Sequence, residues 1–288
     1  IIGNLKPDLV HLNTTCLFQF AKLSKKLNKD IPVITHVREP LLDSIFGKTL
    51  RYMNYRYVDA YIGVESYDLS KMNTKNKISK VVYNSVDFSK YNSKVSSNLL
   101  RNELNISKDK VIFLYLARIS KSNGTLEFVK TIKKIKQSKF HFVIVGATEN
   151  PMNKYESQVL NECRNSNNVN LLKFRNDVPE LIASSDVIIA PFIEPHFSRS
   201  VIEAAAMGKP SIVSNVDGLN ELVIDEVTGL IYNRFNYNDL INKITRLGKS
   251  VHLRESLGKK AEERAKKIFN NEINSQEVFN LYEKLLGK

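Results

Sequence analysis

The sequence has few of the residues from which disulfide frameworks, metal centres and membrane spans are built. Its two cysteines, Cys16 and Cys163, lie far apart, without a Cys-x-x-Cys motif or a histidine spacing typical of a metal site. This pattern favours free, buried thiols in a reducing compartment. No apolar run approaches the roughly 20 residues needed to span a bilayer. Hydrophobic residues make up 42% of the chain, which is enough for a core and argues against disorder.

Several catalytic motifs are also missing. No Gly-x-Gly-x-x-Gly follows an early strand, which argues against a Rossmann oxidoreductase. No Ser-His-Asp or Cys-His set is evident, so the sequence assigns no protein nucleophile.

Positive charge is abundant, with 43 lysine and arginine residues against 30 acidic ones and a net charge of +13. The excess is denser in the first third of the chain. One explanation is solubility alone, and another is attraction to an anionic membrane surface or a phosphorylated acceptor. Nucleic acid is the weakest option, because the basic residues are scattered and no aromatic-interleaved basic stripe is present.

Apolar strand patterns alternate with amphipathic helix patterns along the chain. In the first part we predict strands over 8–12, 32–37, 60–64 and 81–83, and helices over 15–27, 41–54 and 66–72. After a polar connector over 84–97, we predict strands over 111–116, 140–145, 169–172, 186–191 and 211–214, and helices over 125–137, 154–165, 178–184, 238–247, 254–268 and 274–286. Such alternation is typical of parallel sheets with helices on both faces.

The predicted fold class is therefore α/β, with two Rossmann-like lobes. We expect residues 1–95 to form the first lobe and residues 96–270 the second, with residues 271–288 as a helix that packs back towards the first lobe. The chain starts at Ile1 and enters a strand pattern almost at once. We therefore expect that the first lobe is truncated at its N-terminal side.

The stretch over residues 189–232 carries the strongest functional signal. An apolar strand runs into a polar loop, and a helix of small residues follows, with Glu203 inside its first turns. Ligands of α/β proteins bind outside the carboxyl ends of parallel strands, against helix N-termini. A helix start favours phosphate, and a carboxylate slightly deeper can accept hydrogen bonds from sugar hydroxyls. Phosphate and ribose together indicate a nucleotide.

Four separated segments carry a family resemblance. They read Val82-Tyr-Asn-Ser-Val-Asp87, Leu116-Ala-Arg-Ile-Ser-Lys-Ser-Asn-Gly-Thr125, Phe142-Val-Ile-Val-Gly146, and the block from Glu203 through Gly229. In order and spacing, over residues 80–288, they resemble the retaining nucleotide-sugar glycosyltransferases of family 4, also called group 1. The resemblance implies the two-lobed GT-B fold and a site that needs neither a metal ion nor another cofactor, in agreement with the absence of an Asp-x-Asp motif.

By this resemblance Arg118 holds the donor phosphate, since a guanidinium can clamp a diphosphate and balance the charge of the leaving group. The family usually has a lysine five residues later, directly before a glycine. This chain has Asn123 at that position instead, and the following Gly124 matches the family's glycine and is expected to belong to the donor-binding site. Lys121 lies two positions earlier and is expected to reach the second phosphate.

Glu203 resembles the second carboxylate of the family's Glu-x7-Glu motif, which chelates the ribose hydroxyls. The position of the first carboxylate is occupied by Pro195. Two alternatives stay open: Glu194 serves from a loop one residue longer, or His196 and nearby backbone amides hold the sugar.

The start of the same helix offers further donor contacts. The backbone amides around Phe197, Ser198 and Arg199 are candidates for phosphate binding, and Arg199 could add positive charge. The hydroxyls of Ser198 and Ser200 are interpreted first as helix caps.

Two other parts of the chain match the family. Gly218 and Glu221 match its Gly-x-x-Glu loop, where a glycine allows close backbone approach. His36 ends a strand of the first lobe and, by resemblance, contacts the donor sugar near the reacting centre. His11, at the end of the preceding strand, is a weaker candidate.

The resemblance implies a cytoplasmic, peripheral enzyme at the inner membrane face. It would move a hexose from a nucleoside diphosphate sugar to a glycan or lipid-linked acceptor, with retention, in the synthesis of cell-surface polysaccharide or glycoconjugate. We expect no nucleic-acid partner. One alternative is a noncatalytic nucleotide-sugar-binding or regulatory subunit that a partner subunit completes. Another is a different GT-B enzyme such as a sugar-nucleotide epimerase, which would need acid and base carboxylates that are not evident.

Overall fold

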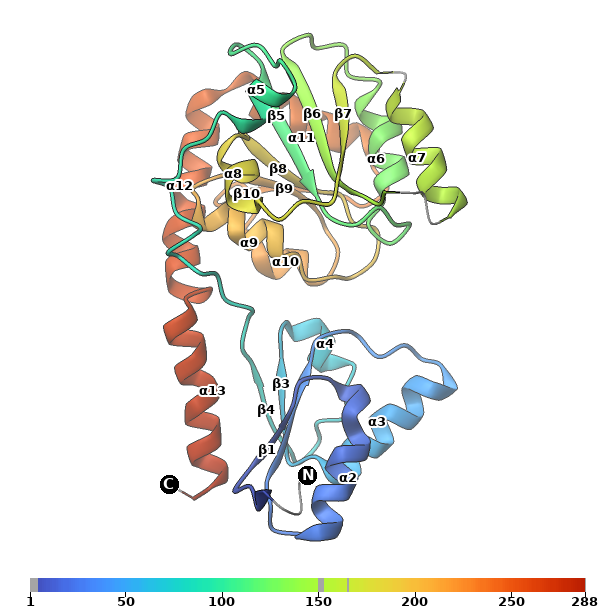
Figure 1. Ribbon diagram of the computed structural model, residues 1–288, viewed down its shortest axis with the longest axis vertical. Helices are drawn as coiled ribbons and strands as arrows, with labels where there is room; N and C mark the ends of the chain where they lie inside the picture. The colour runs from blue at the N-terminus through green and yellow to red at the C-terminus, as the bar shows by residue number, and fades with distance from the viewer. Residues whose placement is uncertain (1–4, 150–152, 165, 288) are drawn as a thin grey trace. The chain divides into compact units, whose positions relative to one another are not determined.

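The computed structural model describes residues 5–149, 153–164 and 166–287. They form two compact units. Unit 1 extends to Ser85 and also includes the segment from Asn271, while unit 2 extends from Val86 to Asn270. Each unit is built around its own parallel sheet (Figure 1). The two-lobed α/β class expected from the sequence is therefore confirmed.

Unit 1 contains a four-stranded parallel sheet in the order β1-β2-β3-β4. The strands are β1 (Val10–Leu12), β2 (Val33–Val37), β3 (Ala60–Gly63) and β4 (Ile78–Val81). The helical segments are η1 (Thr15–Leu17), α2 (Phe18–Leu27), α3 (Ile45–Tyr57), α4 (Ser66–Ser70) and the C-terminal α13 (Asn271–Leu285).

Successive residues of β2 point to opposite faces of this sheet, as the pleat requires. Val33 joins a core with Ala21 of α2 and Leu50 of α3. Ile34 joins a second core with Leu281 of α13. Helices therefore cover both faces, which explains why β2 is buried almost throughout.

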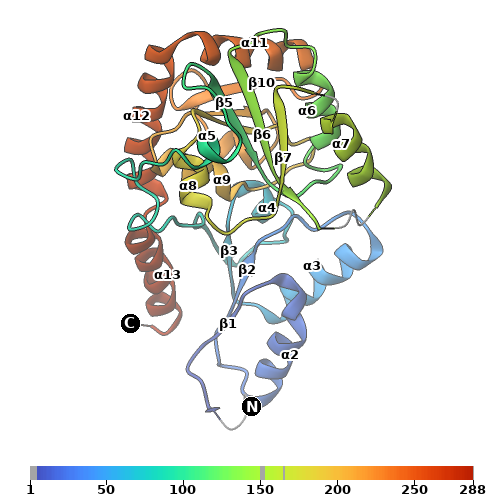
Figure 2. The same cartoon turned by 45° about the horizontal axis from the view of Figure 1, so that its top comes forward.

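Unit 2 contains a six-stranded parallel sheet in the order β10-β9-β8-β5-β6-β7. The strands are β5 (Val111–Leu116), β6 (Phe140–Ala147), β7 (Val169–Lys173), β8 (Val187–Ala190), β9 (Ser211–Ser214) and β10 (Gly229–Tyr232). The helices are α5 (Leu99–Glu103), α6 (Thr125–Ile132), α7 (Lys154–Arg164), α8 (Val178–Ala183), α9 (Arg199–Ala206), α10 (Leu219–Leu222), α11 (Tyr237–Lys249) and α12 (Val251–Ile268). In both cartoon views α6 and α7 lie side by side beside β6 and β7 (Figure 2).

The strand order of unit 2 reverses beside β5. The chain moves outwards from β5 through β6 to β7, and then returns to place β8 on the other side of β5. Such a switch point leaves a crevice outside the carboxyl ends of the two central strands. This topology positions the candidate site.

The structure differs from the predicted elements at several boundaries. The strand predicted over 81–83 lies earlier in the chain, as β4 (Ile78–Val81). It is an edge strand whose Ser79 and Lys80 are polar and exposed, so the sequence there lacks the apolar pattern of a buried strand. The helix predicted over 41–54 begins at Ile45, because the Ser44 side chain caps it by accepting a hydrogen bond from the backbone N–H of Gly47. The short helices α5 and α10 were not predicted, and residue 165 of the helix predicted over 154–165 lies outside the described residues.

The polar connector expected over 84–97 belongs to both units. The division falls between Ser85 and Val86. Residues 86–95, expected in the first lobe, belong to unit 2 because Tyr91 and Val95 pack against its core. The terminal segment from Asn271 belongs to unit 1.

Candidate functional site

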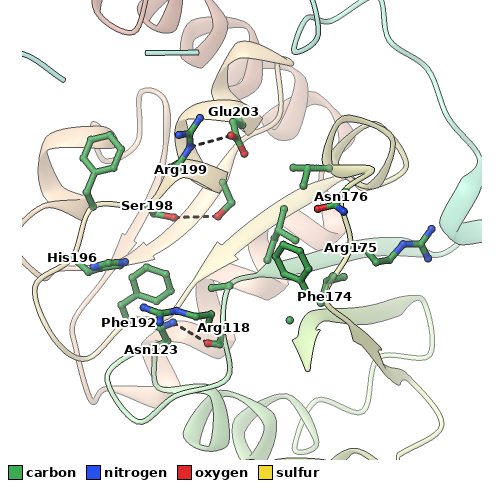
Figure 3. A pocket seen from close by; sticks show the side chains of 17 residues that line it. Arg118, Asn123, Phe174, Arg175, Asn176, Phe192, His196, Ser198, Arg199 and Glu203 are labelled. Carbon is green, nitrogen blue, oxygen red and sulfur yellow. Dashed lines mark hydrogen bonds and ion pairs between the residues drawn. The ribbon is translucent and has the colours of Figure 1, made fainter. Parts of the chain in front are cut away.

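A cavity of about 480 Å³ opens at the switch point of unit 2. Its walls come from the loop after β5, the end of β6, the loop between β7 and α8, and the segment from the end of β8 into α9 (Figure 3). The lining residues are Leu116, Ala117, Arg118, Asn123, Val145, Gly146, Phe174, Arg175, Asn176, Val178, Phe192, His196, Phe197, Ser198, Arg199, Ser200 and Glu203. We call this cavity the switch-point pocket.

The loop after β5 holds Arg118 through its backbone. The Tyr115 hydroxyl donates to the Arg118 carbonyl at 3.1 Å, and Asn123 Nδ2 donates to the same oxygen at 2.9 Å. The guanidinium itself makes no hydrogen bond or ion pair with any residue that the structure describes, although it lines the pocket. The main chain is thus fixed while the charged end stays available to an anionic ligand.

Two glycines allow backbone segments to pack closely together at and behind the wall of the pocket. Gly146 ends the buried part of β6 with a φ of 137°, and a Cβ there would lie 2.1 Å from the carbonyl oxygen of Ala117. Gly124 precedes α6 with a φ of 62°, and a Cβ there would lie 2.6 Å from the carbonyl oxygen of Pro191. Both positions exclude a side chain. Gly146 lines the pocket, whereas Gly124 lies behind it.

The N-terminus of α9 faces the pocket without a side-chain cap. Ser198 occupies the N-cap position, but its hydroxyl makes no capping hydrogen bond. It lies instead 3.1 Å from the hydroxyl of Ser200, and both serines are buried. The capping interpretation of the two serines is therefore wrong. The first N–H groups of a helix have no intrahelical partner, so those of α9 remain for a ligand.

Glu203 lies in the middle of α9 and is only 6% exposed. Burial raises the pKa of its carboxyl group, while Arg199 and Tyr91 act in the opposite direction. Arg199 Nε is 3.5 Å from Oε1, but the Arg199 side chain is 68% exposed, so this ion pair is weak. The carboxylate is held in a desolvated position where additional hydrogen-bond donors would stabilise it.

His196 lies at the edge of the same pocket, and its ring is 5.6 Å from that of Phe192. Desolvation lowers the pKa of His196, and the positive charge of Arg118 lowers it further. A neutral imidazole can both donate and accept a hydrogen bond. Phe197, which follows, is buried and also lines the pocket.

The structure thus brings together six of the predicted site residues, which are Arg118, His196, Phe197, Ser198, Arg199 and Glu203. In Figure 3 Arg118 and Asn123 lie on one side of the pocket, and Arg199 and Glu203 lie on the other, with Ser198 between them.

Five predicted donor-site residues lie outside the lining of the pocket, namely Lys121, Gly124, Glu194, Gly218 and Glu221. Lys121 and Glu194 are exposed on loops. Gly218 precedes α10 with a φ of 86°. The Glu221 carbonyl oxygen accepts a hydrogen bond from Arg264 at 2.6 Å, which ties α10 to α12. Their donor-binding roles remain predictions.

His36 belongs to unit 1, where it takes part in a hydrogen-bonded chain. His11 Nε2 is 2.9 Å from His36 Nδ1, and His11 Nδ1 is hydrogen-bonded to the Tyr282 hydroxyl on α13. The pKa of His36 is lowered to about 4, first by burial and then by the charges of His11 and Arg38. His36 also lines a separate cavity of about 370 Å³ within unit 1. Its contact with a sugar stays a prediction.

Sequence reasoning missed the loop between β7 and α8. Phe174 is 72% exposed at the pocket, and Asn176 lies beside it. Arg175 also lines the pocket but is bound to Glu103 at 2.6 Å and to Asp177. These residues follow the carboxyl end of β7, so the rule that ligands bind at strand ends was the signal that could have identified them.

The described residues hold no group of three or more histidine, cysteine, aspartate or glutamate side chains arranged to bind a metal ion. Over the same residues, no helix is both long enough and apolar enough to cross a bilayer.

Comparison with known sequences identifies related proteins. The family model described as "Glycosyl transferases group 1" matches residues 96–264. A Campylobacter jejuni protein, N,N'-diacetylbacillosaminyl-diphospho-undecaprenol alpha-1,3-N-acetylgalactosaminyltransferase, is 35% identical over 184 residues, which cover 64% of this chain and 47% of that protein. The Staphylococcus aureus capsular polysaccharide biosynthesis glycosyltransferase CapM is 26% identical over 223 residues, which cover 75% of this chain and 58% of CapM. The chain spans about half the length of the curated relatives it matches.

The fold is shared with solved structures. The Anabaena protein HepE, crystallised in complex with UDP-glucose, superimposes with a TM-score of 0.86 over 96% of this chain and 79% of HepE, at 20% sequence identity. This likeness concerns the fold and confirms the GT-B architecture that the resemblance implied. Because the family model covers more than half of the sequence, including every residue that lines the switch-point pocket, the chain belongs to the group 1 family of glycosyl transferases.

Proposed function

We propose that unit 2 binds a nucleoside diphosphate sugar in the switch-point pocket, and that the protein transfers the sugar to a glycan or lipid-linked acceptor with retention of anomeric configuration. One observation carries the proposal. An arginine whose guanidinium has no partner among the described residues, a helix N-terminus that its N-cap side chain does not cap, and a buried carboxylate line the same cavity. The volume of about 480 Å³ is within the range of small-molecule sites.

The cationic side of the pocket suits a diphosphate. Arg118 presents its guanidinium, and the first N–H groups of α9 add the positive end of a helix dipole. These donors would hold the diphosphate in the ground state. They would stabilise it further as the bond between the anomeric carbon and the phosphate oxygen breaks, because negative charge then grows on that oxygen.

The carboxylate side of the pocket suits a ribose. Glu203 is buried and carries no strong ion pair, so two vicinal hydroxyls could donate to its two oxygens and replace the lost solvation. Phe174 offers an exposed ring to a planar base in the same pocket. His196 lines the same pocket and its lowered pKa favours the neutral form, so we expect it to hydrogen-bond a hydroxyl of the donor sugar.

The transfer step follows from the donor chemistry. The bond from the anomeric carbon to the leaving phosphate breaks, and a bond from the same carbon to the acceptor oxygen forms. The proton of the acceptor hydroxyl passes to the departing phosphate. Glu203 is the carboxylate among the described residues that line the pocket, and the proposal gives it to the ribose, so no protein nucleophile is assigned. The resemblance to a retaining family favours retention of the anomeric configuration in this step.

The acceptor class rests on the relatives. The C. jejuni protein is named for a diphospho-undecaprenol-linked sugar, and an Escherichia coli relative is named UDP-Gal:alpha-D-GlcNAc-diphosphoundecaprenol alpha-1,3-galactosyltransferase. CapM is named for capsular polysaccharide biosynthesis. We therefore propose an acceptor on a lipid carrier, cell-surface polysaccharide as the product class, and the cytoplasmic face of the membrane as the location.

Thermal unfolding in the presence of UDP-, GDP- and ADP-sugars tests donor binding. A ligand at one hundred times its Kd stabilises the unit that binds it by about 2.7 kcal/mol. For a unit of this size that is a rise in Tm of about 5–10 °C. The rise should occur for one base and disappear in Arg118→Ala. It should persist in Arg164→Ala, which removes an exposed arginine of α7 outside the pocket.

Silence across the whole panel would overturn donor binding. A shift that survives in Arg118→Ala would overturn the phosphate assignment. Transfer itself is measured with a radiolabelled sugar of the donor that binds and an undecaprenol-linked acceptor. Binding without transfer, in the longest available form of the protein, would favour the noncatalytic subunit over the enzyme.

A further inference from the structure

The loop between β7 and α8, over residues 174–177, forms one wall of the switch-point pocket. Phe174 and Asn176 line the pocket with exposed side chains, and Arg175 lies between them. In Figure 3 the Arg175 side chain extends away from Arg118, whereas the Phe174 ring lies on the side towards Arg118. The wall thus combines an apolar ring with a cation that the proposed diphosphate contacts do not use.

The guanidinium of Arg175 is occupied by two protein carboxylates. Its Nε and Nη2 donate to the two carboxylate oxygens of Asp177, at 2.9 and 2.5 Å. Its Nη1 donates to both carboxylate oxygens of Glu103, at 2.8 and 2.6 Å. These bonds raise the pKa of the Arg175 guanidinium and lower the pKa of the Asp177 carboxyl group. Because all three nitrogens of the fork already donate, Arg175 has little capacity left for a phosphate.

We call the side chains of Glu103, Arg175 and Asp177 the loop brace. Glu103 is the last residue of α5, and Asp177 directly precedes α8. The helix α5 is itself fixed, because its Leu100 is fully buried in the core of unit 2. The brace therefore ties the pocket loop to a firmly packed part of the unit.

The geometry of the brace distinguishes it from an ordinary surface ion pair. The Arg175 side chain is 23% exposed, and a single pair at such a position usually contributes little. Here one guanidinium lies between two carboxylates, with paired hydrogen bonds to each. Paired bonds of this kind fix the orientation of both partners as well as holding them together.

Asp177 takes part in the brace instead of capping its own helix. It occupies the N-cap position of α8, where an aspartate commonly accepts a hydrogen bond from a free backbone N–H. Its side chain makes no such bond, and both of its carboxylate oxygens accept from Arg175. The brace is therefore formed at the expense of a helix cap.

The backbone of the loop is tied at its two ends. The Phe174 N–H donates to the Ala147 carbonyl oxygen at 2.9 Å, and the Leu181 N–H donates to the Asp177 carbonyl oxygen at 3.1 Å. Between these two bonds the Arg175 side chain holds the loop. Fixing Arg175 therefore also fixes the direction of the Phe174 ring beside it.

We propose that Arg175 is a positioning residue, which acts through Glu103 and Asp177 to hold the Phe174 ring ready to stack on the base of the donor nucleotide. This inference rests on the proposed function, because it concerns the base-binding part of the same pocket. Every nucleotide base has a planar face that can stack on an aromatic ring. A loop that is ordered before the ligand arrives spares the entropy that its ordering would otherwise cost on binding.

The competing role for Arg175 is direct contact with the diphosphate, and one substitution separates the two roles. Glu103→Gln removes one charged partner of Arg175 without changing the size of the side chain. If Arg175 braces the loop, this variant should bind a nucleoside diphosphate more weakly. If Arg175 binds phosphate, the variant frees a cation and should bind the same ligand more tightly.

Calorimetry on the full chain compares a ligand that has a base with one that lacks it. The ligands are the nucleoside diphosphate of the donor that binds in the panel, and inorganic pyrophosphate. We expect Glu103→Gln and Asp177→Asn each to weaken binding of the nucleoside diphosphate about 2- to 10-fold, with the pyrophosphate affinity unchanged. Arg118→Ala should weaken both ligands. The control Glu149→Gln, which removes an exposed ion pair with Lys173 outside the brace, should bind both like the original protein.

A double-mutant cycle with Phe174→Ala tests whether the brace acts through the ring. Phe174→Ala alone should weaken binding of the nucleoside diphosphate about 5- to 100-fold, as expected for the loss of one stacked base. In that background Glu103→Gln should have little further effect. A purely structural role would instead weaken both ligands alike in either background. Circular dichroism and thermal unfolding verify that each variant is folded.

Three results would overturn the role of the brace. They are unchanged or tighter binding of the nucleoside diphosphate in Glu103→Gln, an equal loss of pyrophosphate affinity, and additive losses in the cycle with Phe174→Ala. If the original protein still binds the nucleotide and Arg118→Ala does not, these results leave the proposed function standing. Silence of the original protein across the nucleotide panel would overturn the proposed function, and the role of the brace with it.

Discussion

Replacement of Glu203 separates its proposed role in ribose binding from a purely structural role. Its carboxyl group is only 6% exposed, and burial raises its pKa. When the pKa of a carboxyl group is higher in the folded than in the unfolded protein, the free energy of unfolding falls as the pH rises above the unfolded-state pKa. The reason is that the unfolded chain releases the proton at a lower pH than the folded protein does. Glu203→Gln removes this charge without changing the size of the side chain. We therefore expect the unliganded Glu203→Gln variant to be at least as stable as the original protein at pH 7.

Donor affinity should change in the opposite direction. Hydrogen bonds to a charged acceptor contribute about 1.5–3 kcal/mol each, and 1.4 kcal/mol corresponds to a factor of ten in affinity. The amide of Glu203→Gln keeps a single acceptor oxygen. We expect the nucleoside diphosphate of the donor that binds in the panel to bind about 10- to 100-fold more weakly, as measured by isothermal titration calorimetry.

A ligand that lacks both ribose hydroxyls completes a double-mutant cycle. The original protein should bind the 2′,3′-dideoxy form of that nucleoside diphosphate about as weakly as Glu203→Gln binds the ordinary form, and the variant should lose little further affinity for the dideoxy ligand. Glu255→Gln, an exposed position on α12, is the control. Equal affinity of Glu203→Gln and the original protein for the nucleoside diphosphate, or additive losses in the cycle, would refute the assignment of Glu203 to ribose.

Three further predictions concern the walls of the pocket and the histidine chain. Gly146→Ala should lower the free energy of unfolding of unit 2 by about 1–3 kcal/mol in urea titrations, since its Cβ would meet the Ala117 carbonyl oxygen; unchanged stability would contradict that contact. Asn123→Ala should weaken diphosphate binding by loosening the loop that carries Arg118, whereas Lys121→Ala should have a smaller effect because Lys121 lies outside the lining of the pocket; the reverse order in calorimetry would favour Lys121 as a phosphate ligand. The pKa of His36 is lowered to about 4 in the folded state, so stability should fall as the pH falls from about 6.5 to about 4, and His36→Gln should flatten that decline; an unaltered pH profile would argue against a neutral His36.

The elements that position the pocket were predictable because the sequence repeats a simple pattern. Buried parallel strands such as β5 and β8 are continuous apolar runs, and each is followed by an amphipathic helix. Glu203 was identified by its resemblance to the family's second carboxylate, supported by the small residues around it in α9. Arg118 was identified by the same resemblance and by its position two residues after the end of β5.

The parts that were missed depend on contacts between distant residues. Asn123 could be recognised as a departure from the family pattern, but not as a brace for the Arg118 carbonyl, because that hydrogen bond depends on how the loop folds. The Ser198 hydroxyl can bond either the Ser200 hydroxyl or a free N–H group at the start of α9, and the structure has the first bond. The two local hydrogen bonds are of similar strength, so the sequence does not decide between them. The chain from His36 through His11 to Tyr282 joins residues that are 271 positions apart at its far end.

A crystal structure of the chain with the nucleotide sugar that it binds in the panel is the most direct test of the central claim. The account predicts the diphosphate against the Arg118 guanidinium and the N-terminus of α9, with the ribose hydroxyls on the carboxylate of Glu203. A ligand bound elsewhere, or bound in the pocket with Glu203 pointing away from the ribose and Arg118 away from the phosphates, would contradict it.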